Sequence, residues 1–337
     1  MKSVNHNRQQ GAALLAALLV VTLATALVSG LLWREEVRIR TLENQRLRDS
    51  AQWLGVGALD WARLMLREDL YQTGNVDQLG EVWAIPINET PLSDFMQTQG
   101  ATMSEADRET WLSGAVVDAN SHFNLTSLIE VANPQGDAGW VSATRVNPEA
   151  IAIFARLLQS VGLNPEGAGQ VAQALLLQRQ PISAEGDNHL PVTCAADLLG
   201  IIPGATPDQL AVLGQYTVVL PRPSAVNANT ASVMVLAAAL GVTLSQAQQL
   251  VADRTQSYFP DYGSLSSRIR SRAPQWITVS NRNLSVSTEY FWVVERLRHG
   301  RLMLTQQALI SRRAGPGNAT RVLWIKPGLP DGVSVGG

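Results

Sequence analysis

Residues 12–33 have the sequence AALLAALLVVTLATALVSGLLW and contain no Asp, Glu, Lys or Arg. A helix needs about 20 apolar residues to cross the hydrocarbon core of a bilayer, so this run is long enough to span one. Lys2 and Arg8 precede the run, and the positive-inside rule then keeps the N-terminus in the cytoplasm. The sequence predicts one N-terminal membrane helix, with the bulk of the chain outside the cytoplasm.

Three kinds of N-terminal signal contain a run of this type. A cleaved secretory signal peptide has a shorter apolar core, of roughly 7–15 residues, followed by a small-residue cleavage site. An uncleaved signal anchor needs only the apolar helix. A prepilin-type leader is cut on the cytoplasmic side of the apolar run, after a glycine, and Gly11 followed by Ala12 fits that pattern. The length of the run and the position of Gly11 favour the prepilin-type leader.

The helical pattern continues beyond the membrane segment. The first proline of the chain is Pro86, so no proline interrupts a helix over residues 12–70, which would be about 90 Å long. Apolar residues at steps of three and four predict one buried stripe, either on the protein's own domain or on neighbouring subunits of a filament. The stripe comprises Leu47, Ala51, Leu54, Ala58, Trp61 and Met65.

The composition excludes several classes of protein. The chain has 337 residues, of which 46% are hydrophobic and 16% charged, so it can build one or two real cores. The net charge of −2 gives no reason to expect a polyanion as partner. Cys194 is the only cysteine, so no disulfide can form within the chain, and we expect this residue to be a small core residue.

Short apolar runs alternate with turn residues at both ends of the remaining sequence. We expect a strand at residues 82–85 and a hairpin over residues 115–125. Late in the chain, residues 289–298 and 301–312 predict a strand pair, and residues 322–325 predict an edge strand. Helical patterns dominate the segment between these two regions.

This order predicts an α+β fold, in which a long N-terminal transmembrane helix packs on a small antiparallel sheet that carries a large all-α insertion. The predicted parts are a leader (1–11), the membrane and amphipathic helix (12–70), the first half of the β part (71–146), the all-α insertion (147–256), and the second half of the β part with the tail (257–337).

Four motifs, in this order, resemble the K-type minor pseudopilins of type II secretion systems (the GspK family). Together they span nearly the whole chain. They are Gln10-Gly11 with its apolar helix, Val117-Asp118-Ala119-Asn120-Ser121-His122-Phe123-Asn124-Leu125, Leu220-Pro221 with Val226-Asn227-Ala228-Asn229-Thr230-Ala231, and Tyr290-Phe291-Trp292-Val293. The resemblance implies a pseudopilin-like fold.

The fifth residue after the predicted cleavage site is Ala16. Most pseudopilins carry a glutamate there, whereas the K type lacks it, so Ala16 fits the resemblance. In related subunits this carboxylate pairs with the N-terminal amine of an adjacent subunit. An unpaired carboxylate in the bilayer costs roughly 2.5–3.5 kcal/mol or more, so an apolar residue suits a subunit with nothing above it.

The chain departs from the family at an acidic motif that is associated with calcium. The corresponding residues 173–180 contain Arg179 and no aspartate, and Glu185 and Asp187 remain as weak calcium candidates. Calcium takes six to eight oxygen ligands, so the sequence supports no confident cofactor or metal.

Two segments of the helical block, residues 198–205 and 227–254, resemble helix-hairpin-helix motifs. They predict that the all-α insertion is a helix-hairpin-helix or SAM-like domain. Such hairpins can bind DNA phosphates, which makes a membrane-anchored, periplasmic DNA-binding protein of a competence-type system the alternative function. Arg222 is the only basic residue between positions 195 and 250, and phosphate binding usually needs several, so we expect no nucleic acid as partner.

We expect no enzymatic activity. The four histidines, His6, His122, His189 and His299, lie in no metal-ligand spacing, and the known nucleophile and phosphate-loop motifs are missing. The resemblance instead implies a structural subunit of the inner membrane with its bulk in the periplasm. Prepilin peptidase would cut between Gly11 and Ala12, with possible methylation of Ala12. The mature protein would form or cap the pseudopilus tip with minor pseudopilins I and J, and with H, and a secreted exoprotein or the secretin are further partners.

Overall fold

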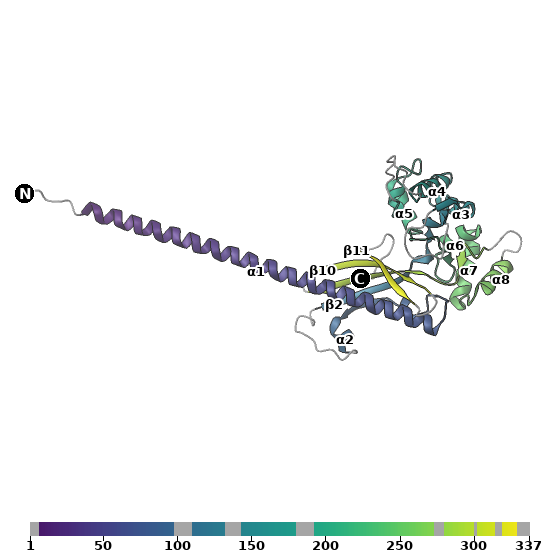
Figure 1. Cartoon of the computed structure of the whole chain (residues 1–337), viewed down its shortest axis with the longest axis horizontal. Coiled ribbons are helices and arrows are strands. Elements are labelled where there is room, and N and C mark those ends of the chain that lie inside the picture. The colour runs from purple at the N-terminus through teal and green to yellow at the C-terminus, as the bar shows by residue number, and fades with distance from the viewer. Residues whose placement is uncertain are drawn as a thin grey trace, which may run out of the picture. The chain divides into compact units, whose positions relative to one another are not determined.

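The computed structural model describes residues 7–97, 110–131, 143–179, 192–272, 280–299, 302–313 and 319–328. The chain divides into two compact units, residues 1–54 and 55–337. The helix α1 (Asn7–Gln72) begins in the first unit and ends in the second (Figure 1). It includes an apolar window with a mean hydropathy of 2.4, which by length and composition can cross a membrane.

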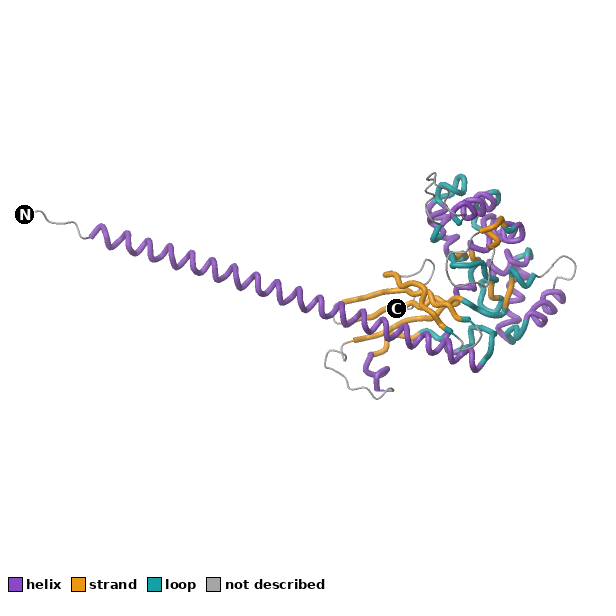
Figure 2. Tube along the Cα trace, viewed as in Figure 1, coloured by secondary structure: helices purple, strands orange, loops and turns teal. Residues whose placement is uncertain are grey.

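A five-stranded antiparallel sheet forms the centre of the second unit (Figure 2). Its strand order is β1-β2-β9-β10-β11, so two strands from the first half of the chain adjoin three from the end. The strands are β1 (Ile87–Pro91), β2 (Thr110–Asp118), β9 (Tyr290–His299), β10 (Leu302–Arg312) and β11 (Thr320–Pro327). The predicted pair of late strands and the predicted edge strand are confirmed.

The last part of α1 covers one face of this sheet. We call the buried residues here the helix-face cluster. In it Trp83 lies edge-on to Phe291, with 5.2 Å between the ring centroids. The cluster comprises Leu59, Ala62, Leu66, Trp83, Val116, Phe291, Val293, Ala308 and Ile310. Ala51 of the predicted stripe is buried, but from residue 58 onward the buried residues lie one position later than predicted, and Ala58, Trp61 and Met65 are only half-buried.

The opposite face of the sheet meets the segment between β5 (Ala143–Val146) and β9, which is mostly helical. The α-helices among its described residues are α3 (Pro148–Ser160), α4 (Gly167–Gln178), α5 (Pro207–Gly214), α6 (Val233–Leu240), α7 (Leu244–Gln256) and α8 (Tyr262–Arg272). A 3-10 helix, η5 (Ala195–Leu198), lies between α4 and α5. The helix α8 was not predicted, because it buries only Leu265 and Ile269, and two apolar positions are too few to mark a helical period.

Local sequence signals explain these helices. Asn147 accepts hydrogen bonds from the backbone N–H groups of Glu149 and Ala150, and Pro148 follows it at the first helical position of α3. Thr243 and Gln246 form a capping box at the start of α7. Gly241 ends α6 with a φ of 67°, which a residue with a side chain rarely adopts, and α6 and α7 meet at 117°.

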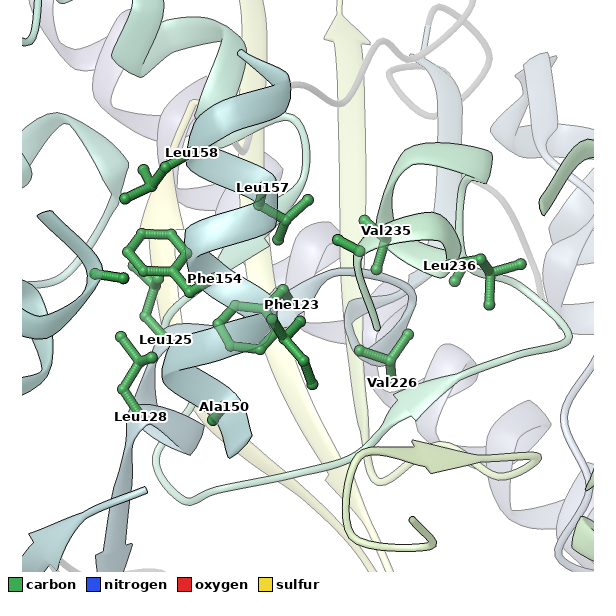
Figure 3. Close-up of a cluster of buried hydrophobic side chains, with 14 of the residues drawn as sticks. Phe123, Leu125, Leu128, Ala150, Phe154, Leu157, Leu158, Val226, Val235 and Leu236 are labelled. Carbon is green, nitrogen blue, oxygen red and sulfur yellow. The ribbon is translucent and has the colours of Figure 1, made fainter. Parts of the chain in front are cut away.

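The insertion has its own hydrophobic core (Figure 3). The rings of Phe123 and Phe154 stack with their centroids 5.8 Å apart, and Leu125, Leu157 and Val235 surround them. Phe123 and Leu125 come from the chain that has just left the sheet, so the segment after β2 belongs to the core of the insertion.

The predicted hairpin over residues 115–125 is wrong. After β2 the chain makes a 3-10 turn, η3 (Ala119–Ser121), in which Asp118 accepts a hydrogen bond from Asn120 N. The next strand, β3 (Phe123–Asn124), pairs in parallel with β6 (Thr217–Val218) rather than with β2. The turn is polar because it is hydrogen-bonded and buried, and not because it is an exposed hairpin loop.

The remaining described elements are short. Residues 82–85 do not form the predicted strand, since η1 (Val82–Ala84) is a 3-10 helix that directs Trp83 into the core. A second α-helix, α2 (Leu92–Gln97), follows β1, and η4 (Leu125–Leu128) follows β3. Two small sheets pair β4 (Ile129–Val131) with β5 (Ala143–Val146), and β7 (Val226–Asn227) with β8 (Leu284–Ser285).

Candidate functional site

The apolar segment of α1 is exposed throughout the part whose side chains are described. Ala16 lies here, among exposed leucines and valines. Thr22 and Thr25 donate to the carbonyls of Leu19 and Val21, each at 2.9 Å, so their hydroxyls are satisfied within the helix. Such a surface suits lipid, where polar groups must find partners within the segment. Positions 11 and 12 are helical in the backbone, and their side chains lie outside the described set.

Asp118 is the centre of a buried hydrogen-bond network between the sheet and the insertion. Its carboxylate accepts from Thr230 Oγ1 at 2.5 Å, Thr288 Oγ1 at 2.6 Å and Asn227 Nδ2 at 2.9 Å. Burial raises the pKa of Asp118, whereas these hydrogen bonds favour its charged form. The network joins the end of β2 to the insertion and to the start of β9.

Asn124 and Asn229, from the two asparagine-containing motifs, hydrogen-bond to backbone groups of the insertion. Asn124 Nδ2 donates to the carbonyl of Arg222 at 2.6 Å, and its Oδ1 accepts from Leu220 N at 3.1 Å. Asn229 Oδ1 accepts from Phe259 N at 2.8 Å, and its Nδ2 donates to Phe259 O at 3.0 Å. The motifs found in the sequence therefore hold backbone segments of the insertion in place.

Arg312, at the end of β10, completes what we call the polar junction: Asp69, Asp77, Asp118, Asn227, Thr230, Thr288 and Arg312. Its guanidinium donates to Asp77 and, at 2.8 Å, to Asp69. It also lies 4.6 Å from the ring centroid of Phe291, in a cation–π contact. Burial raises the pKa of Asp77 to about 7, and Asp118 adds to that shift while Arg312 opposes it.

Sequence analysis missed Arg312, Asp77 and Thr288. A basic residue at the end of an alternating strand looks like an exposed one, and Asp77 lies in a polar stretch typical of a surface loop. The available signal was Arg312-Arg313, which is separated by a single serine from the apolar run Ala308-Leu309-Ile310. An arginine that close to a buried run requires a partner, although the sequence does not say which.

Three carboxylates in the described residues lie close enough to suggest a metal site, namely Asp69, Asp77 and Glu81, whose nearest oxygens are within 4.8 Å of one another. Their charges are already compensated by protein groups. Arg312 pairs with the two aspartates, and Glu81 accepts from Trp83 Nε1 at 2.7 Å and from Gln78 N at 3.0 Å. A guanidinium occupies the place where a cation would bind, so these residues do not fit calcium.

The predicted calcium candidates Glu185 and Asp187 lie outside the described residues. Arg179, which stands in the place of the family's acidic motif, is buried. Its Nη1 donates to the carbonyl of Pro221 at 2.9 Å. In this chain a hydrogen bond from arginine to the backbone therefore holds the end of α4 against the segment that contains Pro221.

No catalytic arrangement is found among the described residues. Asp118 and His122 flank the same turn, yet Asp118 bonds to Thr230 and Thr288, whereas the His122 ring lies edge-on to Trp292 with 5.2 Å between centroids. Burial lowers the pKa of His122 to about 4, so this histidine is neutral at physiological pH.

The predicted helix-hairpin-helix segments offer little charge for DNA. Arg222 is buried and pairs with Glu289 at 2.6 Å. Arg254 donates to the carbonyl of Ala228 at 2.8 Å, and burial lowers its pKa to about 10. Both cations hold the fold together and do not face solvent as a phosphate-binding row would.

A long N-terminal apolar helix whose C-terminal part packs on an antiparallel sheet defines the pseudopilin class of fold, here enlarged by a helical insertion. The sequence matches the family model of the type II secretion system protein K over residues 226–287, which include the asparagine-rich motif. A solved complex of GspK, GspI and GspJ from enterotoxigenic Escherichia coli has a chain of the same fold. Its TM-score is 0.56 at 18% identity, and the match covers 85% of this chain and 99% of that one.

Curated relatives agree with this result. The type II secretion system protein K of Pseudomonas aeruginosa is 27% identical over 314 residues, covering 87% of this chain and 85% of the relative. The protein K of Klebsiella pneumoniae is 30% identical over 176 residues, covering 51% of this chain and 45% of the relative. The family model, the two relatives and the solved structure therefore agree that the chain is similar to protein K of type II secretion systems.

Proposed function

We propose that this protein forms or caps the tip of the pseudopilus by binding minor pseudopilins I and J, with H as a further partner. The observation that carries this proposal is Ala16. An incoming subunit above this one would offer an N-terminal amine, and Ala16 has no carboxylate to receive it. A glutamate without that partner would cost roughly 2.5–3.5 kcal/mol in the bilayer, so alanine suits the last subunit of a filament.

The described surface supports a partner along α1. Val56, Leu64 and Tyr71 are 43%, 52% and 61% exposed, and their spacing places them within about a quarter turn of one another on the helix. They lie on the side of α1 away from the buried stripe, which its own sheet leaves open. Exposed apolar side chains that gather along one element are typical of protein interfaces. The solved relative was crystallised with GspI and GspJ, which makes these two subunits the first partners to test.

Binding of I and J can be tested with the full chain in detergent micelles. Leu64→Asp and Tyr71→Asp should each weaken the complex at least about tenfold, because a buried interfacial charge without a partner costs more than 1.4 kcal/mol. Leu244→Asp is the matched control, since Leu244 is 48% exposed on α7, far along the chain. Unchanged affinity in both α1 variants would exclude this face as the interface.

The proposed function also requires that the protein is inserted in the membrane and processed as a prepilin. Prepilin peptidase cuts between Gly11 and Ala12, with methylation of Ala12, and the N-terminus stays in the cytoplasm while the bulk lies in the periplasm. The intact mass and N-terminal sequence of the membrane-extracted protein, with and without the peptidase, test it. A chain that starts at Met1 in both preparations would exclude cleavage.

The proposed parts of the chain are residues 1–11, 12–70, 71–146, 147–256 and 257–337, and we also propose a helix-hairpin-helix/SAM-like character for the insertion. Its bulk would leave no room for another subunit above it. The subunit would start the filament that pushes folded exoproteins toward the secretin, and it would do so as a structural part without catalysis.

A further inference from the structure

A basic groove lies on the sheet face opposite α1, between β11 and the insertion. It has a volume of about 370 Å³ and continues into a second hollow of about 220 Å³. Thr193, Val219, Trp324 and Lys326 line both, so the two hollows form one continuous surface. None of the features that define the pseudopilin class requires this groove.

A β-bulge in β11 gives the groove its charge. Ile310 pairs with Val322 and Leu309 pairs with Trp324, so Leu323 is an extra residue in this strand. In a regular strand Leu323 and Trp324 would face opposite sides. The bulge reverses the alternation, and both residues pack against the buried cluster on the insertion side of the sheet.

The same reversal brings two cations to one side. Arg321 lies two residues before Leu323, and Lys326 lies two residues after Trp324, so both line the groove together with these apolar residues. The Lys326 ammonium lies 4.7 Å from the ring centroid of Trp324. Without the bulge, Arg321 and Lys326 would project from opposite faces of β11.

The charges of the groove have one sign. Arg179 joins Arg321 and Lys326, and the described residues that line the groove include no Asp or Glu. Asp197, which follows shortly after the rim residue Thr193, is engaged by its own turn: it accepts from Thr193 N at 2.7 Å and from Cys194 N at 3.1 Å. The groove therefore presents two exposed positive side chains, Arg321 and Lys326, above an apolar floor, while Arg179 is buried and bonded to the Pro221 carbonyl.

We propose that this groove binds an extended, acidic peptide segment of a partner protein. Carboxylates of the segment meet Arg321 and Lys326, while an apolar side chain covers Leu323 and Trp324. An extended segment suits the site because Arg321, Leu323, Trp324 and Lys326 line the groove along a single strand. This activity goes beyond the role at the pseudopilus tip and does not depend on it.

The first test uses the full chain in non-ionic detergent micelles and a fluorescein-labelled peptide, Asp-Leu-Glu-Phe-Glu-Leu-Asp. Its control replaces each acid by the corresponding amide. Fluorescence anisotropy should show at least about tenfold tighter binding of the acidic peptide at 50 mM salt, with a smaller difference at 300 mM, because exposed charges are screened. Equal binding of the two peptides would overturn the proposal.

The second test changes the groove. Arg321 and Lys326 are both exposed, so replacing them should not disturb the fold. In the double variant Arg321→Gln with Lys326→Gln, the affinity for the acidic peptide should fall about fivefold or more. The matched control, Arg270→Gln with Arg282→Gln, removes the same charge from exposed positions elsewhere and should stay within about twofold. Unchanged binding in the groove variant would overturn the proposal. Self-association of the native chain that the groove variant abolishes would also overturn it, since a second copy would then be the occupant.

Discussion

Arg312 and Asp77 form an ion pair in which the two side chains are only 1% and 0% exposed. They come from opposite ends of the globular part in sequence, and their contact locks the end of β10 against the loop that follows α1. A buried pair of this kind costs desolvation, yet removing one partner leaves an uncompensated buried charge. The pair therefore defines the geometry of the fold more than it adds to its stability.

Replacing Arg312 should test this directly. Arg312→Met leaves Asp69 and Asp77 without their cation, so we expect a loss of about 3–5 kcal/mol in the free energy of unfolding. Denaturant unfolding of the full chain in micelles, followed by tryptophan fluorescence, measures it. Arg298→Gln breaks the exposed pair with Glu89 and should cost at most about 1 kcal/mol. Equal losses in the two variants would mean that the buried pair has no special role.

Glu295 should make the protein less stable as the pH rises. It is buried on β9, Gln306 Nε2 donates to its Oε1, and burial raises its pKa from 4.5 to about 7. A raised carboxyl pKa favours the folded state below pH 4.5, and this contribution is lost as the pH rises toward 7. The shift corresponds to about 3 kcal/mol. Unfolding midpoints of the native chain and of Glu295→Gln, between pH 4.5 and 7.5, give the comparison.

The amide variant keeps the hydrogen bond and removes the titration, so its stability should exceed that of the native chain at pH 7.5 and approach it at pH 4.5. Asp77, whose pKa is also raised to about 7, titrates in both proteins and cancels in the difference. A constant difference across this pH range would show that Glu295 does not titrate there.

Local patterns predicted local structure well, and pairing over distance poorly. Alternation over residues 289–312 predicted β9 and β10. The strands β2 and β9 pair, although they lie near opposite ends of the globular part in sequence. The periodicity of either strand alone does not reveal its partner. The bulge at Leu323 was equally invisible, because a one-residue shift depends on the partner strand.

The same limit applies to the site. The motifs containing Asp118 and Asn227 were found, but their role as hydrogen-bond partners needs tertiary contacts to be seen. The predicted hairpin failed for that reason: Asp118 looked like a solvated turn residue, whereas Thr230 and Thr288, both distant in sequence, satisfy its carboxylate in the interior.

Two glycines of α1 should respond oppositely to alanine. A Cβ at Gly57 meets nothing within 4 Å, so Gly57→Ala should stabilise the helix by about 0.5–1 kcal/mol. A Cβ at Gly55 would collide with the side chains of Gln306 and Glu295. Gly55→Ala should therefore displace Gln306 from the buried carboxylate and cost about 1–3 kcal/mol. The thermal midpoints of the two variants, in otherwise identical chains, make the comparison. Equal stabilisation by both substitutions would show that a Cβ at Gly55 fits without displacing Gln306.

Asn227 should hold the insertion to the sheet. Its Nδ2 donates to Asp118, to Thr288 Oγ1 at 2.9 Å and to the carbonyl of Asp77 at 3.1 Å. Asn227→Ala leaves these acceptors short of a donor in the interior, which we expect to cost about 1–3 kcal/mol. Asn281→Ala, at an exposed turn, is the matched control and should change stability by less than about 0.5 kcal/mol.

The position of the damage distinguishes a loosened junction from general destabilisation. Because β7 and β8 pair through Asn227 and Ser285, amide hydrogen exchange in Asn227→Ala should rise first at residues 226–231 and 284–288. The insertion core around Phe154 and the pairing of β9 with β10 should keep their protection, since neither depends on this side chain. A uniform rise over the whole domain would instead mean that Asn227 supports the global fold, and that the insertion and the sheet unfold as one unit.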